Sequence, residues 1–206
     1  MQFIDRGLIN RTAQSWQSDR YYKRFKTYDH LVTMLFAAIS GVSSLRELST
    51  VMLACEGKIN HLNMSHLPRR STISDANANR SSEVFGGIYH GLLKRYRKFL
   101  SDSSSRTPAV KNLQIIDSTT ITLFSDILKG SGRPPLTGKK KGGIKMHTMI
   151  HVLEDVPQLV RFSSAACHVH TFLENVELAE GSFVVFDKGY TVWLFCSKLT
   201  PHSVSN

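Results

Sequence analysis

Two aspartates in the sequence share a context that suits metal-ion chemistry. Asp117 directly follows the short, largely apolar run 113–116, and Asp187 directly follows the apolar run 183–186. Runs of this kind predict buried β-strands. If these strands are neighbours in one sheet, both carboxylates emerge into the same crevice. Carboxylates this close repel each other unless a cation lies between them, and Mg²⁺ and Mn²⁺ prefer such hard oxygen ligands. A pair of these ions can activate water and stabilise the leaving oxygen of a phosphodiester.

Taken singly, each aspartate is more typical of a turn or a strand-end cap than of a metal site. The metal interpretation therefore depends on the pair and on the basic charge elsewhere in the chain. Residues 1–146 hold 23 Lys and Arg against 10 Asp and Glu, whereas residues 147–206 hold 3 against 6. The positive charge is thus regional, which favours a polyanionic partner for the first three quarters of the chain.

The densest basic segment, residues 129–145, contains no acid. It combines its cations with Gly and Pro, which predicts a flexible loop suited to phosphates, because each neutralised phosphate releases counterions. A solvated loop that only keeps the protein soluble is the alternative. The segment includes four lysines that we expect to contact DNA, Lys139, Lys140, Lys141 and Lys145.

The first hundred residues predict a small helical bundle. Apolar residues recur at helical spacing over 31–39, 45–55 and 85–99, and Ser44 with Glu47 has the spacing of a capping box. Arg69 and Arg70, followed by hydroxyl caps, begin a short helix whose polar residues extend to Asn77 and Arg80. Such a helix start suits the DNA backbone or a groove. An exposed polar helix with ordinary capping is the alternative.

The pattern changes after a Ser-rich, Pro-terminated stretch that predicts a linker. Strands are predicted at 113–116, 121–124, 144–152, 159–162 and 183–186, with a helix at 172–178. We therefore predict an α+β chain: a helical domain over 1–100, a linker over 101–109, an α/β domain over 110–190 and a divergent tail over 191–206. The apolar stretch at 31–39 is too short for a membrane span, and three scattered cysteines favour a reducing cytoplasm.

Three blocks of the second domain carry a family resemblance. They are Asp117-Ser118-Thr119-Thr120-Ile121, Lys141-Gly142-Gly143-Ile144-Lys145-Met146-His147-Thr148 and Phe186-Asp187-Lys188-Gly189-Tyr190. In this order they resemble the catalytic blocks of the DDE insertion-sequence transposases, in the branch named after insertion sequence four. Upstream, Ser44-Leu45-Arg46-Glu47-Leu48 and Asp75-Ala76-Asn77-Ala78-Asn79-Arg80 are similar to the helical N-terminal domain of many members. The likeness covers about 21–190.

The resemblance implies a ribonuclease-H-like core whose Asp-Asp-Glu triad binds two Mg²⁺ or Mn²⁺ ions. Water would cut a strand at the end of the element, and the freed 3′-hydroxyl would attack target DNA. Asp117 and Asp187 match the first two acids and would be catalytic metal ligands. Lys145 and Lys188, within the family blocks, would lie against DNA. The partners implied are double-stranded DNA, at transposon ends and at the target, and further copies of the chain or a full-length transposase. The implied location is the bacterial cytoplasm, with the nucleoid.

The chain departs from the family after Asp187. The family's Glu lies well beyond the second aspartate, and no acidic residue follows Asp187 here. We therefore expect a partial ribonuclease-H-like domain from a truncated or frameshifted copy, inactive in strand cleavage and with one side of its sheet uncovered. Two alternatives remain open. One is a non-catalytic DNA-binding fragment that inhibits the full-length transposase, and the other is a different ribonuclease-H-like nuclease that needs only two carboxylates.

Four histidines allow a zinc interpretation that we disfavour. His147 and His151 share one face of a predicted strand, and His168 and His170 follow later. Zinc sites without cysteine or an evident outer shell of partners are uncommon. We expect polar packing or contact with the DNA backbone instead.

Overall fold

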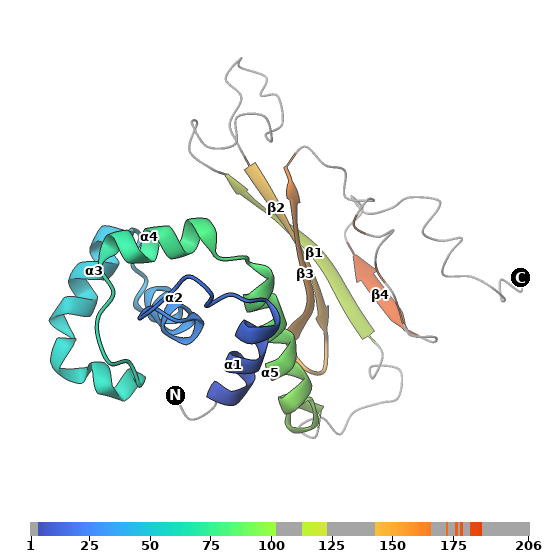
Figure 1. The fold of residues 1–206 in the computed structure, drawn as a ribbon. Coiled ribbons are helices and arrows are strands. Elements are labelled where there is room, and N and C mark those ends of the chain that lie inside the picture. The colour runs from blue at the N-terminus through green and yellow to red at the C-terminus, as the bar shows by residue number, and fades with distance from the viewer. Residues whose placement is uncertain are drawn as a thin grey trace, which may run out of the picture. The chain divides into compact units, whose positions relative to one another are not determined.

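The computed structural model describes residues 4–101, 113–122, 143–165, 172, 176, 178 and 182–186. The chain divides into two compact units, residues 1–96 and 97–206. The first consists of helices and the second holds a β-sheet (Figure 1), so the protein is of the predicted α+β class. Of the predicted linker, only Ser101 is described, as the last residue of a helix, and the predicted tail lies outside the described residues.

The helices predicted from apolar spacing are confirmed. The elements are α1 (Arg6–Ser15), α2 (Thr27–Ser40), α3 (Leu45–Ala54), the 3-10 helix η1 (Glu56–Leu62), α4 (Arg70–Asn79) and α5 (Glu83–Ser101). Ser44 caps α3 by accepting a hydrogen bond from the backbone N of Glu47 at 3.2 Å. The Glu47 carboxylate accepts from the backbone N of Ser43 at 2.8 Å, and hydrogen bonds from Ser43 and from the backbone of Ser44 lower its pKa.

The core of the helical unit forms where α1 to α5 turn their apolar faces inward. Burial of this apolar area is the main force that holds the helices together. The most deeply buried side chains come from five different helices and include Ile9, Val32, Leu48, Ile73, Val84 and Ile88.

A buried polar network crosses this core and is centred on Arg80. Its guanidinium donates to His30 Nδ1 at 2.9 Å, to the Phe25 carbonyl at 3.1 Å and to Asp19 Oδ1 at 3.2 Å. The Arg80 side chain is fully buried. The His30 Nε2 lies 2.6 Å from Asn77 Oδ1. Arg80 and Asn77 therefore join α4 to α2, and Arg80 is neither available to DNA nor part of an exposed polar helix.

The network makes the stability of the helical unit depend on pH. Arg80 can only donate, so His30 Nδ1 accepts and the ring is neutral, with its proton on Nε2. Burial lowers the pKa of His30, and the charge of Arg80 lowers it further, whereas the hydrogen bond with Asn77 raises it. The unfolded chain takes up a proton near the ordinary pKa of about 6.5, so the stabilisation is complete above this pH and falls as the pH drops below it. Urea unfolding midpoints should decrease from about pH 7.5 to about pH 5.5, and less so in His30→Gln, which keeps a donor and an acceptor.

The second unit contains a mixed sheet of β1 (Leu113–Thr122), β2 (Gly143–His151), β3 (Val156–Ser164) and β4 (Phe183–Phe186). The described strands lie in the order β3-β2-β1-β4, with β1 antiparallel to β2, β2 antiparallel to β3, and β4 parallel to β1. Residues 113–122 form one continuous strand, which joins the two strands predicted at 113–116 and 121–124, and residues 123 and 124 lie outside the described residues. The predicted helix at 172–178 is described only in part, with Phe172 helical.

The two faces of this sheet differ in burial. Ile116 and Met149 pair across β1 and β2, point to the same side, and pack with Phe172 in a core. The opposite face carries large apolar side chains that are exposed. They are Ile115, Ile121, Val160, Phe162, Phe183 and Val185.

Among the described residues, no single helix has the length and apolar character to cross a membrane. Only α2 and α3 taken together pass that test, and they are bent by 95°.

Candidate nucleic-acid interface

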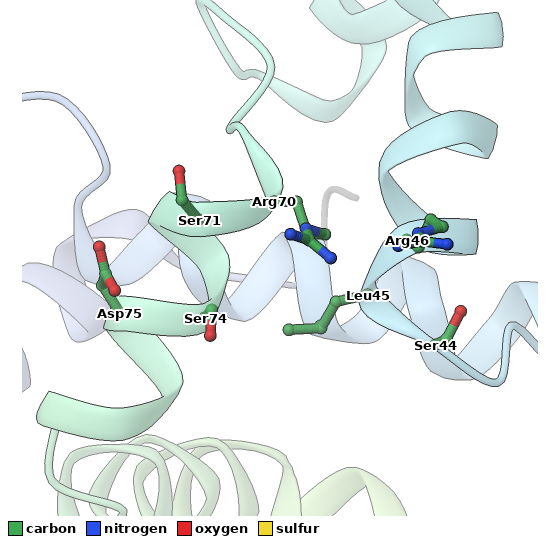
Figure 2. A pocket seen from close by; sticks show the side chains of 7 residues that line it. All are labelled: Ser44, Leu45, Arg46, Arg70, Ser71, Ser74 and Asp75. Carbon is green, nitrogen blue, oxygen red and sulfur yellow. The ribbon is translucent and has the colours of Figure 1, made fainter.

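The N-termini of α3 and α4 border one hollow of about 610 Å³ on the helical unit. Its lining consists of seven residues, all shown in Figure 2: Ser44, Leu45, Arg46, Arg70, Ser71, Ser74 and Asp75. Arg70 extends from the first turn of α4 into the space between the two helices (Figure 2). Arg46 lies in the first turn of α3. Residues 24 positions apart in the sequence thus line the same surface.

The hollow has a positive electrostatic character. Both arginines are exposed, and neither guanidinium forms a hydrogen bond or an ion pair with the described residues. A helix N-terminus already carries partial positive charge, so arginine there slightly destabilises the helix and concentrates the positive potential. Ser71 and Ser74 add hydroxyl groups, and Asp75 places one carboxylate in the lining. Guanidinium, hydroxyl and helix N-terminal N–H groups together are the donors that hold phosphate oxygens.

The two arginines predicted from the sequence separate in the structure. Arg70 lines the hollow just described, whereas Arg69 lines a neighbouring one of about 570 Å³, together with Ser65 and His66. Arg69 is the N-cap residue of α4, and no side chain caps that helix, so the predicted hydroxyl caps are wrong. Arg46 was not among the predicted DNA contacts. The sequence could have indicated Arg46 through its position two residues after Ser44, the N-cap of α3.

Asp117 lies inside a strand and not at its end. It is the fifth residue of β1, its side chain is exposed, and its Oδ1 accepts a hydrogen bond from the backbone N of Ser118 at 2.7 Å. The strand continues beyond it because residues 118–122 remain paired with β2. The last pair described between β1 and β4 is Ile116 opposite Phe186. Asp117 follows that pair directly and lies on the exposed face of the sheet, with Ile115.

Lys145 is on the other face. It is only 5% exposed and pairs with Thr120, whereas Asp117 pairs with Thr148. Because adjacent residues of a strand point to opposite sides, the structure does not bring Lys145 and Asp117 together. The remaining predicted site residues lie outside the described residues. These are Lys139, Lys140, Lys141, Asp187 and Lys188.

His147 is part of the packing of the buried face. Its Nε2 lies 2.9 Å from the Ser163 hydroxyl, and its ring stacks on Phe172 with 4.8 Å between centroids. Burial lowers the pKa of His147, and the nearby charge of Lys145 lowers it further. This is the polar packing expected for the histidine. No group of three or more metal-binding side chains occurs within the described parts of the chain.

Comparison with protein-family models matches the N-terminal part of the chain. Residues 1–65 match the model of a family described as a domain of unknown function, DUF4372. The matched part contains α1, α2, α3 and η1, and so includes Arg46 but ends before Arg70. The chain matches none of the curated proteins and none of the solved structures with which it was compared.

Proposed function

We propose that this chain is a DNA-binding protein of the insertion-sequence transposase type. In this proposal the helical unit holds the DNA backbone at the hollow between α3 and α4. The observation that carries it is the pair of exposed arginines, Arg46 and Arg70, at two helix N-termini that border one hollow. Phosphate contacts of this kind fix a protein on duplex DNA without reading its sequence.

Two further observations support the transposase type. The family matched by residues 1–65 is commonly found in transposases. The strand order β3-β2-β1-β4, with β4 parallel to β1, agrees with the ribonuclease-H-like core that the catalytic blocks imply. Together these two observations favour a helical DNA-binding unit followed by a ribonuclease-H-like sheet. They count against a helical unit that binds some partner other than DNA.

The proposal also assigns Asp117 as a ligand for Mg²⁺ or Mn²⁺, together with Asp187. Ile116 and Phe186 are partners in the parallel register, and each directly precedes one of these aspartates in the sequence. In this proposal the register continues by one residue, which would set the two carboxylates next to each other, where they could share one ion. This is the feature that favours metal-dependent strand cleavage as a second candidate function beside DNA binding alone.

Replacing both Arg46 and Arg70 by alanine should weaken binding to duplex DNA. Each lost phosphate contact removes about 0.9 from the slope of log affinity against log salt. The double variant should therefore lower the slope by about 2 and the affinity roughly 60-fold at about 0.1 M salt. Fluorescence anisotropy of a labelled duplex over a salt series measures both quantities.

The matched control is the double variant Arg11→Ala/Lys94→Ala. Both of these residues are exposed, on α1 and α5, and do not line the hollow. It removes the same charge, so a general charge effect would lower both slopes equally. Equal slopes for the two double variants, or an unchanged slope for Arg46→Ala/Arg70→Ala, would contradict the assignment of the hollow.

A further inference from the structure

Residues 16–26, between α1 and α2, present an aromatic ring among positive charges. Tyr21 is 84% exposed and Trp16 is 50% exposed. Four exposed cations accompany them, and none of the four forms an ion pair with another described residue. These are Arg20, Lys23, Arg24 and Lys26. An exposed aromatic face beside unpaired cations is the combination by which proteins hold single-stranded nucleic acid.

The one acid of this segment, Asp19, is half-buried and paired with Arg80. Asp19 Oδ1 accepts from the backbone N of Thr27 at 2.7 Å, from the Thr27 hydroxyl at 2.8 Å and from Arg80 at 3.2 Å. The buried guanidinium of Arg80 therefore balances the charge of Asp19. The Asp19 side chain is 27% exposed, but its charge is paired with Arg80, so the four cations dominate the exposed charge of the segment.

The same network fixes the backbone on both sides of Tyr21. Tyr22 packs its ring against Arg80, with 4.1 Å between the guanidinium carbon and the ring centroid, and Phe25 is buried. Arg20 lies over the ring of Tyr21 at 5.4 Å and donates to Gln17 Oε1 at 3.3 Å. With Tyr22 anchored, the backbone next to Tyr21 is fixed while the Tyr21 ring remains exposed. A backbone fixed before binding loses less conformational entropy when a ligand stacks on the ring.

A hollow of about 530 Å³ adjoins this segment and offers groups that recognise base edges. Amide and guanidinium side chains are the usual donors and acceptors for exposed base edges. The lining consists of Asn10, Ala13, Gln14, Gln17, Asp19 and Arg20. Three of these six are amides, and Arg20 belongs both to this hollow and to the contact with Tyr21.

We propose that residues 16–26 bind single-stranded DNA, with an unpaired base stacked on Tyr21 and the flanking phosphates held by Arg20, Lys23 and Arg24. This inference rests on the proposed DNA-binding function and adds a second surface to it. The α3–α4 hollow then holds duplex backbone, and the segment at 16–26 takes a strand whose bases are unpaired, as at an opened DNA end.

The test is the affinity for a labelled oligothymidylate of about 15 nucleotides, measured by fluorescence anisotropy at fixed salt. Tyr21→Ala should weaken binding about 5- to 100-fold, the range expected for loss of one stacked base. Tyr21→Phe keeps the ring and should bind like the wild type. Ile39→Ala is the control, because Ile39 is also 84% exposed but lies at the end of α2. Unfolding curves of the three variants should match that of the wild type.

Duplex DNA of the same length separates this inference from the proposed function. We expect Tyr21→Ala to bind duplex like the wild type, and Arg46→Ala/Arg70→Ala to lose duplex binding. If the wild type binds duplex but Tyr21→Ala binds oligothymidylate normally, the single-strand site is wrong and the proposed function stands. Equal weakening of both ligands by Tyr21→Ala would also overturn base stacking. A wild type that binds neither ligand would overturn both proposals.

Discussion

Replacing Arg80 by alanine should cost the helical unit about 3–5 kcal/mol of unfolding free energy, because it leaves a buried ionic network without its centre. The Arg80 side chain has no exposed surface. Its removal leaves the Asp19 carboxylate without its ion-pair partner and the Phe25 carbonyl without a donor. It also removes the donor to His30. Each buried polar group left unsatisfied carries its own desolvation cost.

Urea unfolding followed by helical circular dichroism, on the full chain, measures this loss. The control is Arg95→Ala, which breaks the ion pair of Arg95 with Asp5 at a position where the Arg95 side chain is 53% exposed. An exposed pair of this kind contributes at most about 1 kcal/mol. A similar, small effect in both variants would show that Arg80 does not hold the helices together.

The sequence was sufficient to predict the helices with a clear apolar face. Leu48 and Met52 are buried on α3, as their spacing predicts, and Ser44 caps that helix. The apolar spacing over 45–55 continues one residue beyond α3, which ends at Ala54 before the chain turns through Cys55 into η1. Spacing indicates a periodic face well, but it cannot distinguish the last α-helical turn from a 3-10 turn that follows it.

The polar stretch 117–120 misled the strand prediction. Asp, Ser and Thr together are typical of a turn, yet here they continue β1 because their backbone pairs with β2. Thr119 and Thr120 also have high strand propensity, which favours the extended conformation once a partner strand is present. Pairing between distant segments decided this region, and a single stretch of sequence does not contain that information.

The candidate interface depended on tertiary contacts in the same way. Arg46 and Arg70 line one hollow only because α3 packs beside α4. The sequence of either helix alone does not indicate that the two arginines share a surface. Arg80 was expected at the polar end of α4, for which DNA contact and an exposed polar helix were both open, and arginine is rarely buried. Its burial requires Asp19, which lies 61 residues earlier in the chain. Residue type and position within a helix identified candidate arginines. Tertiary packing decided which of these arginines remain available for DNA.

Asp117 allows a test of cation binding by the second unit, because an aspartate within β1 does not favour the strand. Aspartate has low strand propensity, and its exposed carboxylate lies on the face that also carries Ile115 and Val160. A threonine there would suit the strand better, so Asp117→Thr should leave the stability of the sheet unchanged or slightly higher. An acid at such a position is readily explained if it binds a cation that the sheet itself does not need.

Changing Asp117 to alanine should lower the affinity of the second unit for Mn²⁺ by at least about 10- to 100-fold, since loss of an outer-shell partner alone commonly costs that much. Paramagnetic broadening of the amide signals of Ile116 and Ser118 during a Mn²⁺ titration measures the binding locally. Asp75→Ala, an exposed aspartate of the helical unit, is the control and should leave this broadening intact. Unchanged broadening in Asp117→Ala would place the metal elsewhere.

The same variants, incubated with labelled duplex DNA and Mn²⁺, test strand cleavage separately. Strand cleavage by the wild type that disappears in Asp117→Ala would show that Asp117 acts in catalysis and that the ion it binds is the catalytic one.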